Sequence, residues 1–278
     1  MEQNNPLKQY FRQYKMFLRL PSGKTYYKHE EVELNELGEL GIKAMTGQDE
    51  LILKNPDALL NGEAIIEVIK SCVPAVKNPK VLLSNDIDAI ITAIRHASFG
   101  DSLESTLLCP KCEKENTFTL DLQYALDNMT MLEADYVINL ENGLSLFVKP
   151  YSFPEMLKGL HAQFEQAKLS RELEREGITD EEKSAAFKRA FEMLSRITFE
   201  LISKAVVKIV NEEAGINVTE QKYIIEFIRD ADREVVDKIQ ALVKEISEIG
   251  IKKEFTAQCT HCNHTWSSEI DFNPVNFL

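Results

Sequence analysis

The 278-residue chain is poor in basic residues and in cysteine, and it contains no long apolar run. Lys and Arg total 32 against 45 Asp and Glu, which gives a net charge of −13 and a pI near 5.0. This balance argues against nucleic acid or an anionic membrane as the main partner, because both require a basic footprint. Since no stretch of about 18 residues is uniformly apolar, we expect no membrane span.

Cysteine occurs only five times, at uneven spacings. That is too few for a secreted disulfide framework, and residues 1–6 do not resemble a signal peptide. We therefore expect a reducing cytosol, where paired cysteines usually serve metal or redox chemistry. The hydrophobic content of 44% is that of a globular protein, and the length suits about two domains.

Residues 1–28 oppose the overall charge and form a basic amphipathic N-terminal arm. Six basic residues stand there against one acidic residue. Apolar side chains recur at steps of three and four, which predicts a short surface helix; they are Leu7, Tyr10, Phe11, Tyr14, Phe17 and Leu18. We interpret the arm either as a plain surface element or as a docking arm for an acidic partner surface.

The segment 29–125 predicts a first α/β unit. Short apolar alternations within 31–45 indicate strands, and Thr46 with Asp49 is typical of a helix N-cap. Residues 48–98 then indicate helices, and Gly100 ends the last of them. That helix has the clearest apolar stripe, formed by Ile87, Ile90, Ile91, Ile94 and Ala97.

The segment 126–272 predicts a second unit, with a C-terminal tail at 273–278. Alternating residues over 136–149 flank Asn142-Gly143, which favours a hairpin with a type I′ turn. From about 153 to 249 the chain has a helical, highly charged pattern, with a capping box at 179–182 and a break at Gly215. We expect the apolar residues from Phe187 to Ile209 to lie on one helix and to face the protein core.

The strongest signal is a cysteine spacing that occurs twice. Cys109 and Cys112 form one C-x-x-C pair, and Cys259 and Cys262 form another. A glycine, Gly100 or Gly250, precedes each pair by nine residues, and Asp121 or Asp271 follows each pair by nine residues. Each copy thus predicts a helix, a glycine, a strand, a C-x-x-C turn at the tip of a hairpin, which we call a knuckle, and a return strand. The second knuckle with its strands is expected at 253–272.

A fainter repeat lies upstream of the knuckles. Residues 42–46 match 148–152 in pattern, and an acid follows three residues after Thr46 and after Ser152. From this position to the knuckle the second copy is 44 residues longer, and the surplus falls in the charged helices. We infer a helical insertion in the second copy.

Two C-x-x-C pairs supply the four thiolates of a tetrahedral structural zinc site, so the expected cofactor is one Zn²⁺ per chain held by Cys109, Cys112, Cys259 and Cys262. The 146 intervening residues exceed ordinary ribbon spacing. The expected fold class is therefore α+β: predominantly helical with short strands, two C-x-x-C hairpins forming one split zinc ribbon, and a long helical insertion.

Alternative interpretations of the cysteines remain open. A redox dithiol would stand at a helix N-terminus, whereas a strand-like segment follows Cys112. A catalytic zinc would need an open coordination position. His261 and His264 are possible substitute ligands but are expected to be exposed neighbours, and Cys72 is expected to be a small core residue.

No motif of an enzyme is present. The sequence contains no phosphate loop, nucleophile elbow or zinc-protease helix. His96 is a lone histidine beside Arg95, and the carboxylates are scattered over helices without pairing. We therefore expect a protein that is not an enzyme, with no catalytic residues and no small-molecule substrate.

Several short motifs, in order along the chain, resemble the baseplate hub subunit family of T-even-type contractile-tailed phages. They cover nearly all of the chain except about 160–245. The matching residues are Leu20 to Lys24 with Tyr26, Ala44 to Thr46 with Asp49 and Glu50, Leu60 to Ile65, Ser71 to Val73, Asp86, Asp88, Ala93 to Arg95, Phe99 and Gly100, the two cysteine pairs, Asp271 to Pro274, and Phe277.

This resemblance implies a structural or assembly protein of the tail baseplate hub, with other hub and tail proteins as partners. Its expected location is the host cytoplasm during assembly and the virion tail baseplate. The rival interpretation is a zinc-ribbon adaptor that binds nucleic acid or the transcription machinery. It is disfavoured because the basic residues near the knuckles, Lys111, Lys114, Lys252 and Lys253, are offset by Glu104, Glu113, Glu115, Glu254 and Glu269.

Overall fold

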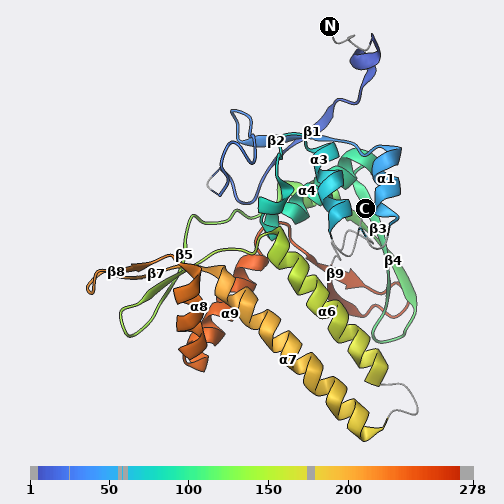
Figure 1. Ribbon diagram of the computed structural model, residues 1–278. Helices are drawn as coiled ribbons and strands as arrows, with labels where there is room; N and C mark the ends of the chain where they lie inside the picture. Colours follow the sequence, from blue (N-terminus) through green and yellow to red (C-terminus); the bar gives the residue numbers. More distant parts are fainter. Residues whose placement is uncertain (1–5, 25, 56–57, 59–61, 174–178, 270–278) are drawn as a thin grey trace. The chain divides into compact units, whose positions relative to one another are not determined.

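A computed structural model describes the chain except residues 1–5, 25, 56–57, 59–61, 174–178 and 270–278 (Figure 1). The chain forms two compact units, residues 1–132 with 248–278, and residues 133–247. The second knuckle segment, 253–272, therefore clusters with the first unit and not with the helical insertion. Asp271 and the tail at 273–278 lie outside the described residues.

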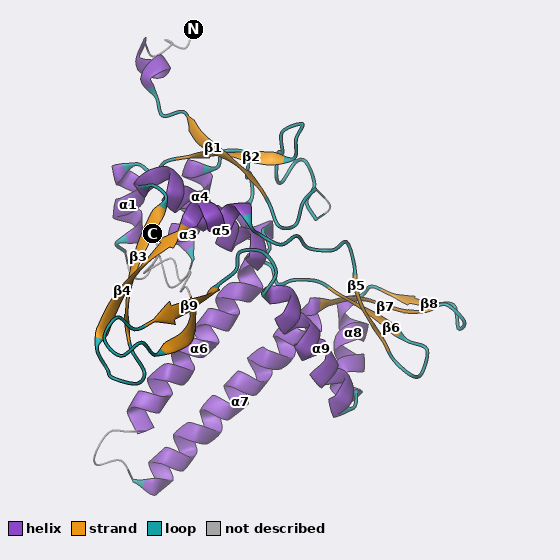
Figure 2. Ribbon diagram, turned by 180° about the vertical axis from the view of Figure 1, so that it is seen from behind, coloured by secondary structure: helices purple, strands orange, loops and turns teal. Residues whose placement is uncertain are grey.

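Unit 1 combines short helices with three two-stranded antiparallel sheets (Figure 2). Its elements in chain order are the 3-10 helix η1 (Pro6–Tyr10), β1 (Tyr14–Arg19), β2 (Glu39–Lys43), α1 (Gly47–Leu53), α3 (Glu63–Cys72), the 3-10 helix η2 (Pro79–Val81), α4 (Ser84–Phe99), β3 (Ser102–Leu108), β4 (Glu115–Asp121), α5 (Leu122–Asp127), β9 (Glu254–Gln258) and β10 (Thr265–Glu269). The mixture of helices and small sheets is α+β, as expected.

The core of unit 1 is built around α4, and the predicted stripe is inside it. Ile87, Ile90, Ile91 and Ile94 are all buried, and burying each such side chain contributes about 1.5–3 kcal/mol. Gly100 ends α4 with a φ of 94°, a conformation that favours glycine.

The capping box before α1 is confirmed. The side chain of Thr46 accepts from the backbone N–H of Asp49, and the Asp49 carboxylate accepts from the backbone N–H of Thr46. These two bonds satisfy N–H groups that would otherwise lack partners at the start of the helix.

The predicted N-terminal helix is wrong. Among the described residues of the segment 1–28 only η1 is helical, and Tyr14–Arg19 is a strand that pairs antiparallel with β2. The apolar residues also alternate, so that Leu18 is buried while Phe17 and Arg19 are exposed. A short apolar run fits both periods, and pairing with Glu39–Lys43 decides between them.

The described residues of unit 2 form a four-stranded antiparallel sheet and four helices. The sheet order is β5 (Tyr136–Asn139), β6 (Ser145–Val148), β7 (Val206–Asn211) and β8 (Ile216–Val218). The helices are α6 (Phe153–Leu173), α7 (Asp180–Ala205), α8 (Gln221–Asp230) and α9 (Arg233–Ser247). Among the described helices of the chain, none combines the length and apolar content that crossing a membrane requires.

Helices α6 and α7 lie side by side and antiparallel (Figures 1 and 2). Lys204 near the end of α7 pairs with Glu155 at the start of α6 at 3.3 Å. The Glu155 carboxylate also accepts from the backbone N–H and hydroxyl of Ser152. This cap corresponds to Thr46 with Asp49, so both copies of the upstream repeat are a strand followed by a capped helix.

Two expectations for the helical insertion are wrong. The helix that begins at Asp180 ends at Ala205, and Ile209 lies in β7. The run Val206 to Val210 is rich in β-branched residues, which favour a strand. Phe187 and Phe191 are 62% and 63% exposed, so only the last turns of α7 belong to the core.

The hairpin at 136–149 is confirmed, but its turn is different. Leu140 and Leu144 face each other, and Gly143 donates its N–H to the carbonyl of Leu140. Gly143 has a φ of 78°, whereas Asn142 is not among the described residues with positive φ. A type I′ turn needs positive φ at both central residues, so the loop is instead the three-residue kind that places glycine last.

Candidate metal centre

Each C-x-x-C pair lies in the connection between two antiparallel strands. Residues 109–114 join β3 to β4, and residues 259–264 join β9 to β10. Cys109 donates its N–H to the carbonyl of Lys114 at 3.0 Å, and Cys259 donates to His264 at 2.8 Å. The two connections therefore close with the same hydrogen bond at equivalent residues.

The same match extends to the backbone conformation of the knuckles. Glu113 and Asn263 each follow the first cysteine by four residues, and their φ angles are 57° and 56°. They are the only non-glycine residues with positive φ in the described part of the chain. Because this conformation costs free energy for an ordinary side chain, its appearance twice indicates that the cysteine geometry requires it.

The four sulfur atoms converge on one point. Cys109 Sγ lies 3.7 Å from Cys262 Sγ, and Cys112 Sγ lies 3.6 Å from Cys259 Sγ. All four sulfurs lie within 4.8 Å of one another. A tetrahedral ion with metal–sulfur bonds of about 2.3 Å would space the sulfurs by about 3.8 Å. Disulfide bonds of about 2.05 Å are excluded, and all four cysteines are free.

The cysteines differ in exposure within each pair. Cys109 and Cys259 are buried, and Cys112 and Cys262 are half-buried. Burial acts to raise the pKa of Cys259, but hydrogen bonds from the backbone of Cys262 and His261 and from neighbouring thiols lower it to about 6. Such bonds stabilise a thiolate, which is the form that binds metal.

Asn116 joins the two hairpins directly. Its side-chain oxygen accepts from the backbone N–H of Thr260 at 2.8 Å and from the Thr260 hydroxyl at 3.0 Å. Its amide nitrogen donates to the carbonyl of Lys114 at 2.9 Å. One buried side chain thereby connects both knuckles.

An aromatic cluster holds the hairpins together below the cysteines. The ring of Phe118 in β4 meets Trp266 in β10 edge-on, with centroids 5.8 Å apart. It also meets Phe255 in β9 at 5.9 Å. Edge-to-face pairs of this kind contribute about 0.5–1.5 kcal/mol beyond area burial.

The base of the second hairpin is anchored to α4. Asn85 donates its amide to the carbonyl of Ile249 at 2.7 Å, and Lys253 pairs with Asp88 at 2.6 Å. Burial raises the pKa of Asp88, and Lys253 opposes that rise. Since α4 leads into β3, these contacts place the two cysteine hairpins beside each other although 146 residues separate the pairs.

The other candidate residues do not join the centre. His261 is exposed, while His264 is half-buried and stacks on Trp266 at 6.2 Å. Neither histidine belongs to the group of possible ligands found among the described residues. Cys72 is buried in α3, and that burial raises the pKa of its thiol to about 11. His96 contacts only Asp101 among the ion pairs of the described chain, at 3.1 Å.

Sequence reasoning missed the residues that bring the halves together. Asn116 occupies a strand position without any distinguishing spacing. Asp88 and Lys253 have opposite charges, but 164 residues lie between them and nothing local connects them. The one local signal is Asp88 itself, an acid that lies next to the apolar stripe of α4.

Comparisons with known proteins give one match. A family model described as T4 bacteriophage base plate protein matches residues 11–278. Comparison with curated proteins and with solved structures gives no match. Because the matched region covers nearly the whole chain and includes all four clustered cysteines, the chain belongs to the T4 bacteriophage base plate protein family.

Proposed function

We propose that this protein is a non-enzymatic structural or assembly component of the tail baseplate hub, held in shape by one Zn²⁺. The observation that supports the metal is the convergence of four cysteine sulfurs from two distant hairpins. Family membership supports the baseplate. The narrower assignment to the hub rests on the motif resemblance.

Zinc fits the donor set better than other common ions. Four thiolates in a tetrahedral arrangement are typical of structural zinc, whereas carboxylate or carbonyl oxygens suit magnesium and calcium. With four protein ligands, no coordination position is open for water or substrate. Cys109, Cys112, Cys259 and Cys262 would hold the ion, and it would supply a cross-link between the two hairpins.

The cross-link would set the tertiary structure of unit 1. Structural zinc has apparent binding free energies of roughly 10–16 kcal/mol in isolated peptides. The described hairpins are each only two strands, and a two-stranded hairpin alone is marginally stable. The metal would therefore stabilise the two hairpins as a pair, whereas each hairpin by itself would be only marginally stable.

A partner role fits the remaining features. We expect other baseplate or tail proteins as partners, in the host cytoplasm during assembly and in the virion tail baseplate. The net charge of −13 disfavours nucleic acid as a partner.

The zinc proposal is tested by measuring the number of zinc ions per chain in the purified protein by inductively coupled plasma mass spectrometry. We expect one zinc per chain in the wild type and in the control variant Cys72→Ser, and almost none in Cys109→Ser or Cys259→Ser. Two zinc ions per chain, or none in the wild type, would contradict the shared site.

The hub assignment has a separate test. Complete particles and assembly intermediates are isolated from infected cells and probed for this chain. Association with hub or tail proteins supports the assignment, whereas specific DNA binding at physiological salt favours the adaptor interpretation instead.

A further inference from the structure

The N-terminal segment of unit 1 presents a row of large apolar side chains to solvent. Leu7, Tyr10, Phe11, Tyr14 and Phe17 are between 48% and 76% exposed, and we call them the N-terminal patch. Figure 1 shows η1 extending away from the rest of unit 1. Exposed apolar patches of this kind mark interaction surfaces.

Strand β1 has a free edge beside this patch. In the described part of the chain it pairs only with β2, in a two-stranded sheet. Along its six residues only Leu18 is buried. An unpaired strand edge exposes backbone N–H and C=O groups, and natural proteins usually cover or blunt such edges.

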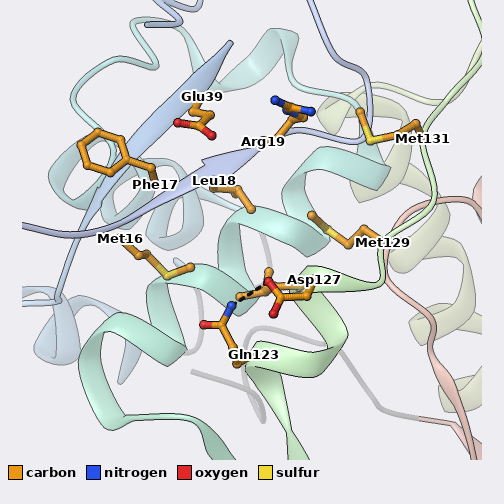
Figure 3. Close-up of a pocket in the computed structure, with 10 residues that line it drawn as sticks. Met16, Phe17, Leu18, Arg19, Glu39, Gln123, Asp127, Met129 and Met131 are labelled. Atoms are coloured by element: carbon orange, nitrogen blue, oxygen red, sulfur yellow. Dashed lines mark hydrogen bonds between the residues drawn. The ribbon is translucent and has the colours of Figure 1, made fainter. Parts of the chain in front are cut away.

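A pocket of about 360 Å³ opens beside β1 (Figure 3). Met16 and Phe17 line it from the strand, Gln123 and Asp127 from α5, and Met129 and Met131 from the segment that follows α5. Methionine side chains adapt to irregular partners. Arg19 and Glu39 also line it, so the pocket combines apolar with charged and polar groups. It can take one side chain of a segment that lies next to the strand.

The N-terminal segment is basic, although two acids, Glu39 opposite Arg19 and Asp127, line the adjacent pocket. Residues 6–19 contain four basic residues and no acid, and Lys8, Lys15 and Arg19 are exposed. The fourth, Arg12, is bound within the chain: it donates to the carbonyl and hydroxyl of Ser71 at 2.6 Å each. Arg12 thus ties the N-terminal segment to α3, and the exposed side chains of Lys8, Lys15 and Arg19 lie along the patch.

This charge selects the kind of occupant. A second copy pairing β1 with β1 would place Lys15 and Arg19 near the same cations of its twin, and like charges across a strand pair are destabilising. A segment with acidic residues meets complementary charge instead. Addition of a strand to an exposed sheet edge is an established way of binding an extended segment.

We propose that the free edge of β1, the N-terminal patch and the adjacent pocket form a docking site for an extended acidic segment of a partner protein. The segment adds a strand to β1, its carboxylates face Lys15 and Arg19, and one of its side chains enters the adjacent pocket. The site does not involve the cysteines, so its test is independent of the zinc measurement.

The test titrates full-length protein against a labelled synthetic peptide of about ten residues that alternates glutamate with valine and leucine. Fluorescence anisotropy measures affinity, and hydrogen exchange locates the protected amides. We expect binding that protects the amides of β1. Phe17→Ser, or Lys15→Glu combined with Arg19→Glu, should weaken binding by about tenfold or more.

Matched controls distinguish specific docking from non-specific hydrophobic binding. Phe187→Ser, which removes an aromatic ring of similar exposure from unit 2, should leave affinity unchanged. A peptide N-methylated at alternate residues should bind at least about tenfold more weakly, since it cannot donate to a strand edge. Circular dichroism checks that each variant is folded.

Four outcomes would overturn the proposal. The glutamate peptide does not bind, or a lysine version binds equally well. Alternatively, the protein self-associates through β1 in a manner that Phe17→Ser abolishes, which identifies a second copy as the occupant. Finally, binding to anionic phosphatidylserine vesicles without binding to the peptide would identify a membrane surface instead.

Discussion

The two cysteine hairpins share one backbone design but differ in what supports it. Both close with the same hydrogen bond from the first cysteine, and both place a non-glycine residue at positive φ four positions later. At the seventh position after the first cysteine, however, the first hairpin has Asn116 and the second has Trp266. Asn116 bonds to the opposite knuckle, whereas Trp266 packs on the opposite strand.

This difference separates two physical tasks. Clustering of the four cysteines requires the same local conformation twice, so the knuckles are alike. Joining two hairpins requires complementary surfaces, because two identical faces would leave either polar groups unpaired or rings without partners. The equivalent positions therefore differ: Asn116 of the first hairpin forms polar bonds to the second, and Trp266 of the second hairpin packs against an aromatic ring of the first.

Removal of the metal should have the largest effect and should not distinguish the hairpins. Treatment with a zinc chelator should lower the free energy of unfolding by more than about 4 kcal/mol, a fraction of the 10–16 kcal/mol seen in zinc peptides. Cys112→Ser and Cys262→Ser should lose equal stability in thermal melts. The chelator should have no further effect on either variant, and an additional loss would point to a second site.

Asn116→Ala should destabilise the protein by about 1–3 kcal/mol. It removes a buried amide that accepts two hydrogen bonds from Thr260 and donates one to the carbonyl of Lys114. Thr260→Ala, the matched control, removes only the hydroxyl donor and should cost about 1 kcal/mol or less. Chemical denaturation measures both. Equal effects would show that the backbone bond is unimportant.

The aromatic cluster should contribute less and unequally. Phe118→Leu disrupts contacts to both Phe255 and Trp266, whereas Trp266→Leu disrupts only one of these ring pairs. Each pair lost should cost about 0.5–1.5 kcal/mol. Urea titrations of both variants should therefore rank Phe118→Leu as the more damaging, and the reverse order would assign the packing to Trp266 and its other neighbour, His264.

The smallest effect should come from the residues at positive φ. Glu113→Gly relieves a left-handed conformation that glutamate adopts at a cost, so we expect a gain of up to about 1 kcal/mol. Asn263→Gly should be nearly neutral, because asparagine tolerates this region. Differential scanning calorimetry compares the pair, and a loss in Glu113→Gly would show that its side chain has another role.

Features of local structure were predicted well from the sequence. The spacing of Ile87 to Ile94 located the buried face of α4, Thr46 with Asp49 located the start of α1, and the two C-x-x-C pairs located both knuckles at hairpin tips. Each of these depends on residues within a few positions of one another. The family resemblance was likewise confirmed at the level of a phage baseplate protein, while its hub specificity remains a prediction.

The errors occurred where local patterns were ambiguous. The spacing of Tyr14 to Leu18 fits a helix or a strand, and Ile209 extends a helical stripe across Ala205 although it lies in β7. The Asn142-Gly143 pair suits two kinds of hairpin loop. In all three cases the partner strand selects the outcome, and the partner cannot be identified from neighbouring residues.

The sequence by itself determined the two C-x-x-C pairs, the start of α1 and the deficit of positive charge, because spacing, capping and composition are local or additive properties. Only the tertiary structure showed that all four sulfurs lie within 4.8 Å of one another, with two pairs 3.6 and 3.7 Å apart across the hairpins. It also decided that Asn116, Asp88 and Lys253 assemble that centre, and that basic residues near the N-terminus flank an open strand edge. These features depend on contacts between segments far apart in the chain, and the spacing of neighbouring residues does not specify such contacts.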